Sequence, residues 1–165
     1  MPNNAKELIL PIVEGCDSLK IGVISTCINH CIEYGEGIYG ALKKIFPVMD
    51  VEERLVGNIS YILTEKCINS GQEIKKIFDS LIFLIGNYQS SSINITYEFA
   101  KACFAHEGNA PEKIINDILS IAKNNPLLSY YIVYSFMNVC FINGKRIHEV
   151  CSFAHKFIKN YDVLA

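Results

Sequence analysis

The chain has 165 residues, of which half are apolar and 19% are charged, and its net charge is −2. This length suits one domain with a sizeable core, and the charged share lies below the roughly 25% of an average soluble protein. Because there is no basic excess to hold a phosphate backbone, nucleic acid is not an expected partner.

Cysteine usage and hydropathy bear on the compartment. The seven cysteines are an odd number, and no long apolar run precedes Glu14, so we expect a cytoplasmic chain with reduced, buried thiols. The uncharged run at residues 127–142, LLSYYIVYSFMNVCFI, contains Ser129, Ser135 and Asn138. It is shorter than the roughly 20 residues that span a bilayer, so the sequence does not favour a membrane span.

A period of about 36 residues runs through the chain. The spacings between Cys31, Cys67, Cys103 and Cys140 are 36, 36 and 37 residues. Apolar or thiol side chains recur at fixed distances before these cysteines, namely Val23, Ile59, Ile95 and Ile132 eight residues before, and Cys27, Leu63, Phe99 and Phe136 four residues before. Such spacings place side chains on one face of a helix. We call the four cysteines with these flanking positions the repeat columns.

In chain order, the pattern predicts a single all-α domain. Residues 4–13, with Ile9 and Ile12 in helical register, are expected to form an N-terminal capping helix. Four helix–turn–helix units should follow near 20–49, 56–85, 92–123 and 128–160. The turns are marked by Gly35, Gly71 and Gly144, each four residues after a repeat cysteine, whereas the third unit has Gly108 and an insertion.

The glycines of the first unit also match a phosphate-binding spacing, Gly35-x-Gly37-x-x-Gly40. A dinucleotide fingerprint requires a strand before the first glycine. The preceding residues instead align with three other predicted helices. We therefore interpret Gly35 as the glycine that ends a helix, and we expect no cofactor there.

This organisation resembles the α-solenoid class of helical-hairpin repeats, such as HEAT and tetratricopeptide arrays. The resemblance rests on the period and pattern of the four units and points to no specific family. It implies a stack of hairpins that binds proteins along a groove. The alternative is a closed multi-helix bundle, which would enclose a small apolar ligand or a metal.

The candidate binding residues lie on the first helix of each unit. Tyr61, Tyr97 and Tyr134 stand six residues before a repeat cysteine, and Ser25 takes this position in the first unit. Tyrosine offers a rigid apolar area with a polar tip, as at interface hot spots, although packing between units would also explain this column. Next to it, a polar rim is expected from Asn29, Glu65, Lys101 and Asn138. We therefore expect an adaptor that binds a partner peptide or helix.

Two groups of side chains could hold zinc in the closed-bundle alternative. The first group is Cys27, His30 and Cys31, and the second is His148, Cys151 and His155. The repeat columns instead assign Cys31 and Cys151 to the core and both histidines of the last helix to the outer face, so no metal is expected.

Catalysis and self-association complete the expectations. Cys103, His106 and Glu107 are near one another in sequence, but Cys103 belongs to a repeat column, so an enzyme is not expected. The expected last helix is apolar and contains Val150, Phe153 and Phe157. If the chain self-associates, we expect a homo-oligomer through an open end of the stack.

Overall fold

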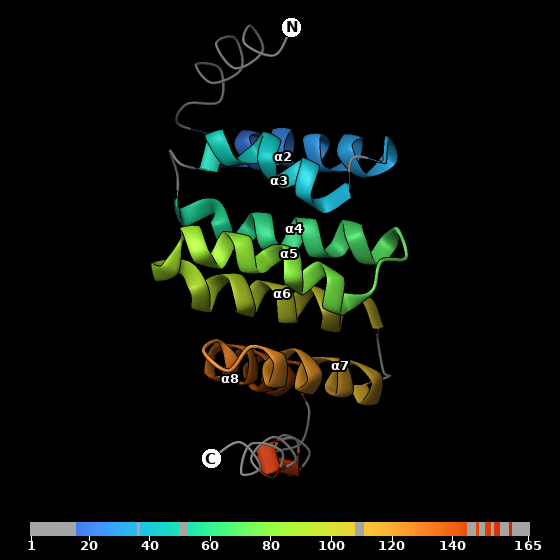
Figure 1. Cartoon of the computed structure of the whole chain (residues 1–165), viewed down its shortest axis with the longest axis vertical. Helices are drawn as coiled ribbons and strands as arrows, with labels where there is room; N and C mark the ends of the chain where they lie inside the picture. The colour runs from blue at the N-terminus through green and yellow to red at the C-terminus, as the bar shows by residue number, and fades with distance from the viewer. Residues whose placement is uncertain are drawn as a thin grey trace, which may run out of the picture.

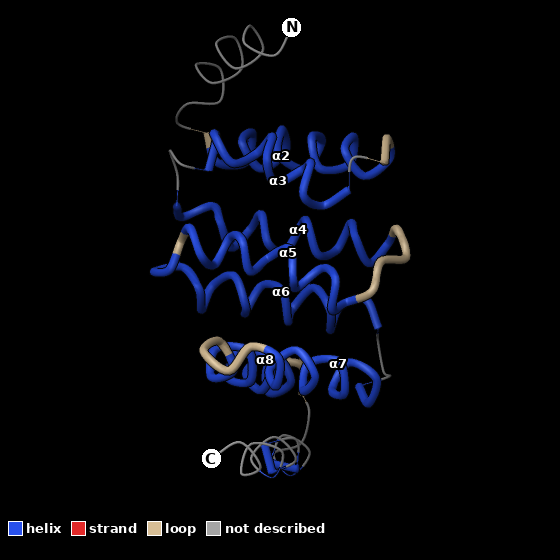
Figure 2. The backbone as a smooth tube through the Cα atoms, viewed as in Figure 1, coloured by secondary structure: helices blue, strands red, loops and turns tan. Residues whose placement is uncertain are grey.

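The chain folds into helices throughout the part that the computed structural model describes, which is residues 16–35, 37–49, 53–107 and 111–144 with positions 148, 151, 152, 154, 155 and 159. These residues contain seven α-helices, two short 3₁₀ turns and no β-strand (Figure 2). The elements are α2 (Asp17–Glu33), α3 (Gly37–Met49), η1 (Glu53–Leu55), α4 (Val56–Asn69), α5 (Ile74–Asn87), η2 (Gln89–Ser91), α6 (Ser92–Glu107), α7 (Pro111–Asn124) and α8 (Ser129–Ile142). The predicted all-α class is confirmed. The expected capping helix at residues 4–13 lies outside the described residues.

The helices stack along the long axis of the molecule in two layers. Figure 1 shows α2 and α3 at one end and α7 and α8 towards the other. One layer is the succession α2, α4, α6 and α8, in which each helix packs against the next. In the other layer α3 contacts α5, and α5 contacts α7. This arrangement is compatible with a helical repeat. Of the fourth predicted unit, α8 is described and the second helix falls for the most part outside the described residues.

The starts of successive first helices are tied together by polar contacts. Arg54 of η1 reaches back to Asp17 at the start of α2, with 2.8 Å between Nη2 and Oδ1. The Glu53 carboxylate accepts hydrogen bonds from the hydroxyls of Ser90 and Ser91, immediately before α6. These exposed contacts contribute little energy, but they link positions 37 or 38 residues apart and so follow the sequence period.

The buried side chains follow most of the predicted repeat columns. Cys31, Cys67, Cys103 and Cys140 are all buried. Leu63, Phe99 and Phe136, four residues before three of these cysteines, are at most 1% exposed. The ring of Phe99 lies 5.1 Å from that of Phe78 on α5, so the core joins the two layers.

The first helix departs from this pattern. Cys27 was expected in a core column but is exposed, and α2 instead buries Ile24, Ile28 and Cys31. The reason is the position of α2 as the first described helix of its layer, because α4 covers only one of its two edges. Cys151 was also expected in the core and is exposed.

Three turns repeat the same hydrogen bonds. Gly35, Gly71 and Gly144 have φ angles of 74°, 80° and 75°, which a side chain would disfavour. Each glycine N–H donates to the carbonyl three residues earlier, on Ile32, Ile68 and Phe141 respectively. The phosphate-loop spacing at Gly35 is therefore a helix end that is preceded by α2, not by a strand. Gly108 of the third unit lies outside the described residues.

No helix among the described residues has the length and apolar character needed to cross a membrane.

Candidate partner-binding surface

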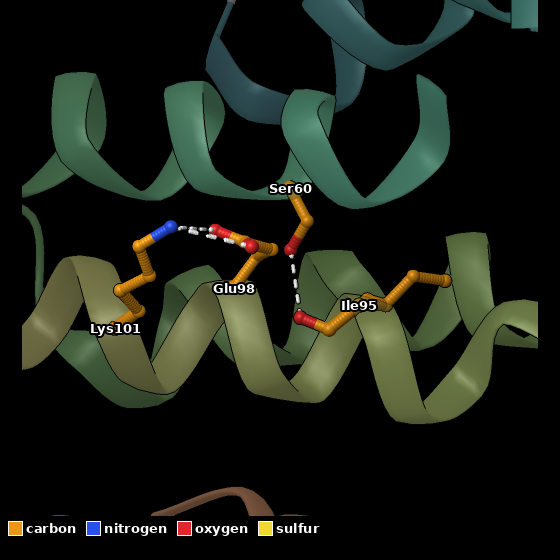
Figure 3. A network of polar contacts seen from close by, with 4 residues as sticks. All are labelled: Ser60, Ile95, Glu98 and Lys101. Carbon is orange, nitrogen blue, oxygen red and sulfur yellow. Dashed lines mark hydrogen bonds and ion pairs between the residues drawn. The ribbon is translucent and has the colours of Figure 1, made fainter. Parts of the chain in front are cut away.

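The first helices pack closely because small residues line the junctions between them. At the α4–α6 junction, a Cβ added at Gly57 would lie 3.5 Å from the Asn94 Cβ. The buried Ser60 hydroxyl donates to the Ile95 carbonyl at 3.0 Å, as Figure 3 shows. A buried hydroxyl requires such a partner, so this bond holds the two helices at a short separation.

The next junction uses the same chemistry. Thr96 on α6 and Ser135 on α8 are buried, and their hydroxyl oxygens lie 3.0 Å apart. The Thr96 hydroxyl also donates to the Ser92 carbonyl, at 2.9 Å within its own helix. A further hydroxyl on α4, that of Thr64, is buried and has no hydrogen-bond partner among the described residues. The junctions of this layer are thus small and polar, in contrast to the aliphatic and aromatic core between the layers.

These junctions place the predicted tyrosines on one layer. Tyr61 on α4 and Tyr97 on α6 are half-buried, and Tyr97 packs against the core. Tyr134 on α8 is 45% exposed and stacks on Tyr130, with ring centroids 5.9 Å apart and an interplanar angle of 18°. Ser25, in the same position on α2, is half-buried. The tyrosines of this column are therefore partly packed against neighbouring side chains and partly exposed to solvent.

The predicted polar rim reaches this column at one point. The Lys101 Nζ lies 3.0 Å from the Glu98 carboxylate (Figure 3). It also lies 5.3 Å from the centroid of the Tyr61 ring. The cation–π contact spans α4 and α6 and fixes the exposed face of Tyr61 beside a charge pair. Of the other rim residues, Asn29 and Glu65 are half-buried and Asn138 is exposed.

The sequence analysis missed several residues of this surface. Glu98 was not predicted, nor were the exposed apolar residues Leu127, Tyr130, Phe141 and Ile142 at α8. Their signal was available, because Tyr130 and Phe141 lie four residues before and seven residues after Tyr134, on the same helical face. The run at residues 127–142 carries no charge, so it was interpreted in terms of a membrane span and its helical periodicity was not used.

The two candidate zinc groups are not brought together. Cys27, His30 and Cys31 lie on α2, at one end of the stack, whereas His148, Cys151 and His155 follow in sequence after α8, which lies towards the other end (Figure 1). His30 packs against Tyr34, with ring centroids 4.4 Å apart. In the part of the chain that the structure describes, no three His, Cys, Asp or Glu residues form a group suited to a metal ion.

The thiols of the repeat columns are structural in their setting. Cys67 is fully buried, and this burial raises its pKa from 9.0 to about 12. Cys103, which lies three residues before His106, is also fully buried, whereas His106 is exposed. A nucleophilic cysteine needs an accessible thiolate, which this column does not offer.

A hollow of about 610 Å³ lies beside the turn between α4 and α5. Its lining includes Glu73, Lys75, His106 and Asp117, and most of these side chains are exposed. Charged walls do not suit the small apolar ligand of the closed-bundle alternative.

Comparisons with known proteins add no identification. No protein-family model matches the sequence, and no curated protein or solved structure gives a significant match.

Proposed function

We propose that this chain is an α-solenoid-like scaffold that binds a partner peptide or helix along the layer of α2, α4, α6 and α8. The observation that supports this most is the succession of these helices, which presents Tyr61, Tyr97 and Tyr134 from equivalent positions on three neighbours. Aromatic side chains with part of their area exposed are the usual anchors of such interfaces.

The polar contacts at the junctions support a preorganised surface. Bonds such as Ser60 to Ile95 and Thr96 to Ser135 hold neighbouring helices in register, and Lys101 orients one face of Tyr61. A rigid aromatic surface loses little conformational entropy on binding. The partner we expect is an amphipathic segment whose apolar side chains contact the tyrosines and whose polar groups reach Glu65, Lys101 and Asn138.

The proposal also concerns location. The chain has seven cysteines, an odd number, which suits a reducing compartment, and we propose the cytoplasm. Neither catalysis nor a cofactor is part of the proposed role.

Affinity capture with variants tests the proposal. The native chain, a Tyr61→Ala/Tyr97→Ala/Tyr134→Ala variant and a Tyr34→Ala/Tyr39→Ala control would each be used as bait in lysate of the source cells. Tyr34 and Tyr39 are 72% and 66% exposed but lie outside the column, so they match its chemistry and not its position. A specific partner should bind the control and lose at least about 30-fold in affinity for the column variant, as hot-spot losses of 2 kcal/mol or more imply.

A second variant guards against misfolding, since Tyr97 packs against the core. Lys101→Ala removes an exposed rim cation and should leave helical content unchanged while it weakens the same partner. Equal binding by all folded variants would refute the groove and move the search to α3, α5 and α7.

A further inference from the structure

The α4–α6 junction carries more negative than positive charge around its tyrosines. Two carboxylates, those of Glu65 on α4 and Glu98 on α6, accompany one ammonium group, that of Lys101. Glu98 takes this ammonium, because its two carboxylate oxygens lie 3.0 and 3.4 Å from the Lys101 Nζ. Glu65 is half-buried one helical turn after Tyr61, and it forms no ion pair with another described residue. One negative charge beside Tyr61 is therefore left uncompensated.

Contacts within the chain hold the lysine away from Glu65. A Cβ added at Gly57 would lie 3.6 Å from the Glu98 Cγ, so the stem of Glu98 lies close to the α4 backbone. The Glu98 side chain is 19% exposed and that of Lys101 is 50% exposed. The Lys101 Nζ also lies 5.3 Å from the centroid of the Tyr61 ring. Glu98 and Tyr61 thus fix the position of this cation.

The other charges of the layer do not reverse this balance. Lys66 is half-buried, and its counterparts Ala102 and Val139 are each 1% exposed, so this repeat position is turned towards the interior of the stack. The third counterpart, His30, is exposed on α2, the first described helix. Glu33, at the end of α2, is exposed and adds a further carboxylate. The helix α8 contains no charged residue.

We infer that the groove binds a partner segment with a lysine or arginine side chain, which pairs with Glu65 beside Tyr61. This inference rests on the proposed groove and names the chemistry of its partner. Complementary charge across an interface selects the partner and orients it. The Tyr61 ring also suits a cation, since aromatic faces attract ammonium and guanidinium groups and this ring already has Lys101 over it. The apolar side chains of the same segment would contact Tyr97 and Tyr134.

Selection from a library of random peptides displayed on phage tests the inference on the full chain. The native protein, Glu65→Lys and Asp79→Lys would each be immobilised. Asp79 is exposed on α5, in the other layer, so this control makes the same change of charge away from the groove. Peptides selected on the native chain and on the control should be enriched in Lys and Arg. Those selected on Glu65→Lys should lose this enrichment or favour Asp and Glu.

Binding of the selected peptides to Tyr61→Ala separates this inference from the proposed groove, once circular dichroism has shown that the variant is folded. Peptides that require Tyr61 and are rich in Lys or Arg support both. Peptides that require Tyr61 but show no charge preference, or are selected equally by Glu65→Lys, overturn the basic partner and leave the groove standing. Acidic peptides selected by the native chain would assign recognition to Lys101 and also overturn it. If no peptide requires Tyr61, the groove and the inference both fail.

An isosteric variant guards against misfolding, because Glu65 is half-buried. Glu65→Gln keeps the shape of the side chain and removes its charge. It should weaken the binding of a selected basic peptide at least about threefold at low salt, and the difference from the native chain should shrink as salt is added. Isothermal titration calorimetry measures both constants. Equal affinities of the native chain and Glu65→Gln at low salt would contradict the pairing.

Discussion

The α4–α6 junction and the exposed side of α8 carry equivalent positions of the repeat with side chains of different size and exposure. At the junction, Gly57 and Ser60 allow two helices to meet closely and share a buried hydrogen bond. On α8, Tyr130 takes the position of Gly57 and Phe141 takes the position of Ile68, and both rings are exposed. Related positions are thus closely packed on α4 and exposed on α8. The comparison shows that the burial of a repeat position depends on whether another helix packs against it.

The largest expected effect is the difference in stability loss between alanine substitutions of Phe99 and Phe141. Phe99→Ala removes a ring packed between the layers against Phe78 and should lower the free energy of unfolding by about 3–5 kcal/mol. Phe141→Ala removes an exposed ring and should change the stability of the monomer by less than about 0.5 kcal/mol. Urea denaturation at low protein concentration measures both. Similar losses of stability in the two variants would mean that Phe141 is packed as part of the core.

Glycine substitutions test how closely the helices meet. Gly57→Gln introduces a side chain at the α4–α6 junction and should cost about 1–3 kcal/mol through overpacking. Gly22→Gln makes the same change on α2, where no atom lies within 4 Å of the added Cβ, and should stabilise by up to about 1 kcal/mol through helix propensity. Thermal unfolding followed by circular dichroism shows whether each variant lowers or raises the melting temperature. A neutral Gly57 variant would show that the junction can widen.

Two identical threonine substitutions should have opposite signs. Thr96→Val leaves the buried Ser135 hydroxyl without its partner on α6 and should cost about 1–2 kcal/mol. Thr64→Val removes a buried hydroxyl that has no partner among the described residues, and should be neutral or stabilise by up to about 1 kcal/mol. Denaturant midpoints at constant slope distinguish the two variants. An equal loss of stability at Thr64 and Thr96 would contradict a stabilising role for the hydrogen bond between Thr96 and Ser135.

Thiol reactivity should differ between the interior and the ends. The pKa of Cys67 is raised to about 12, so its thiol should resist alkylation at pH 8, whereas the exposed Cys16, Cys27 and Cys151 should react within minutes. The raised pKa favours the folded state fully below pH 9, and this stabilisation declines as the pH rises from 9 towards 12 because the unfolded chain ionises first. Mass spectrometry of peptides after brief alkylation gives the order, and early labelling of Cys67 would show local opening of α4.

Much of the fold could be predicted from the period of the sequence. The units expected to begin at residues 20, 56, 92 and 128 have first helices that begin at Asp17, Val56, Ser92 and Ser129. The turn glycines Gly35 and Gly71 and the core column through Leu63 and Phe99 were also correctly placed. These features depend on helical periodicity and on the positive φ of glycine, both of which are local properties of the chain.

The tertiary structure alone decided which faces are covered. Cys27 has the spacing of a core residue and is exposed, since α4 covers only the other edge of α2. Tyr61 and Tyr134 share a repeat position, yet one faces Lys101 across a junction and the other stacks on Tyr130 in the open. By itself the sequence determined an all-α chain, its turns and the apolar face of most helices. A period states how a side chain is oriented on its own helix, but burial depends on the neighbouring helix, and only packing supplies that.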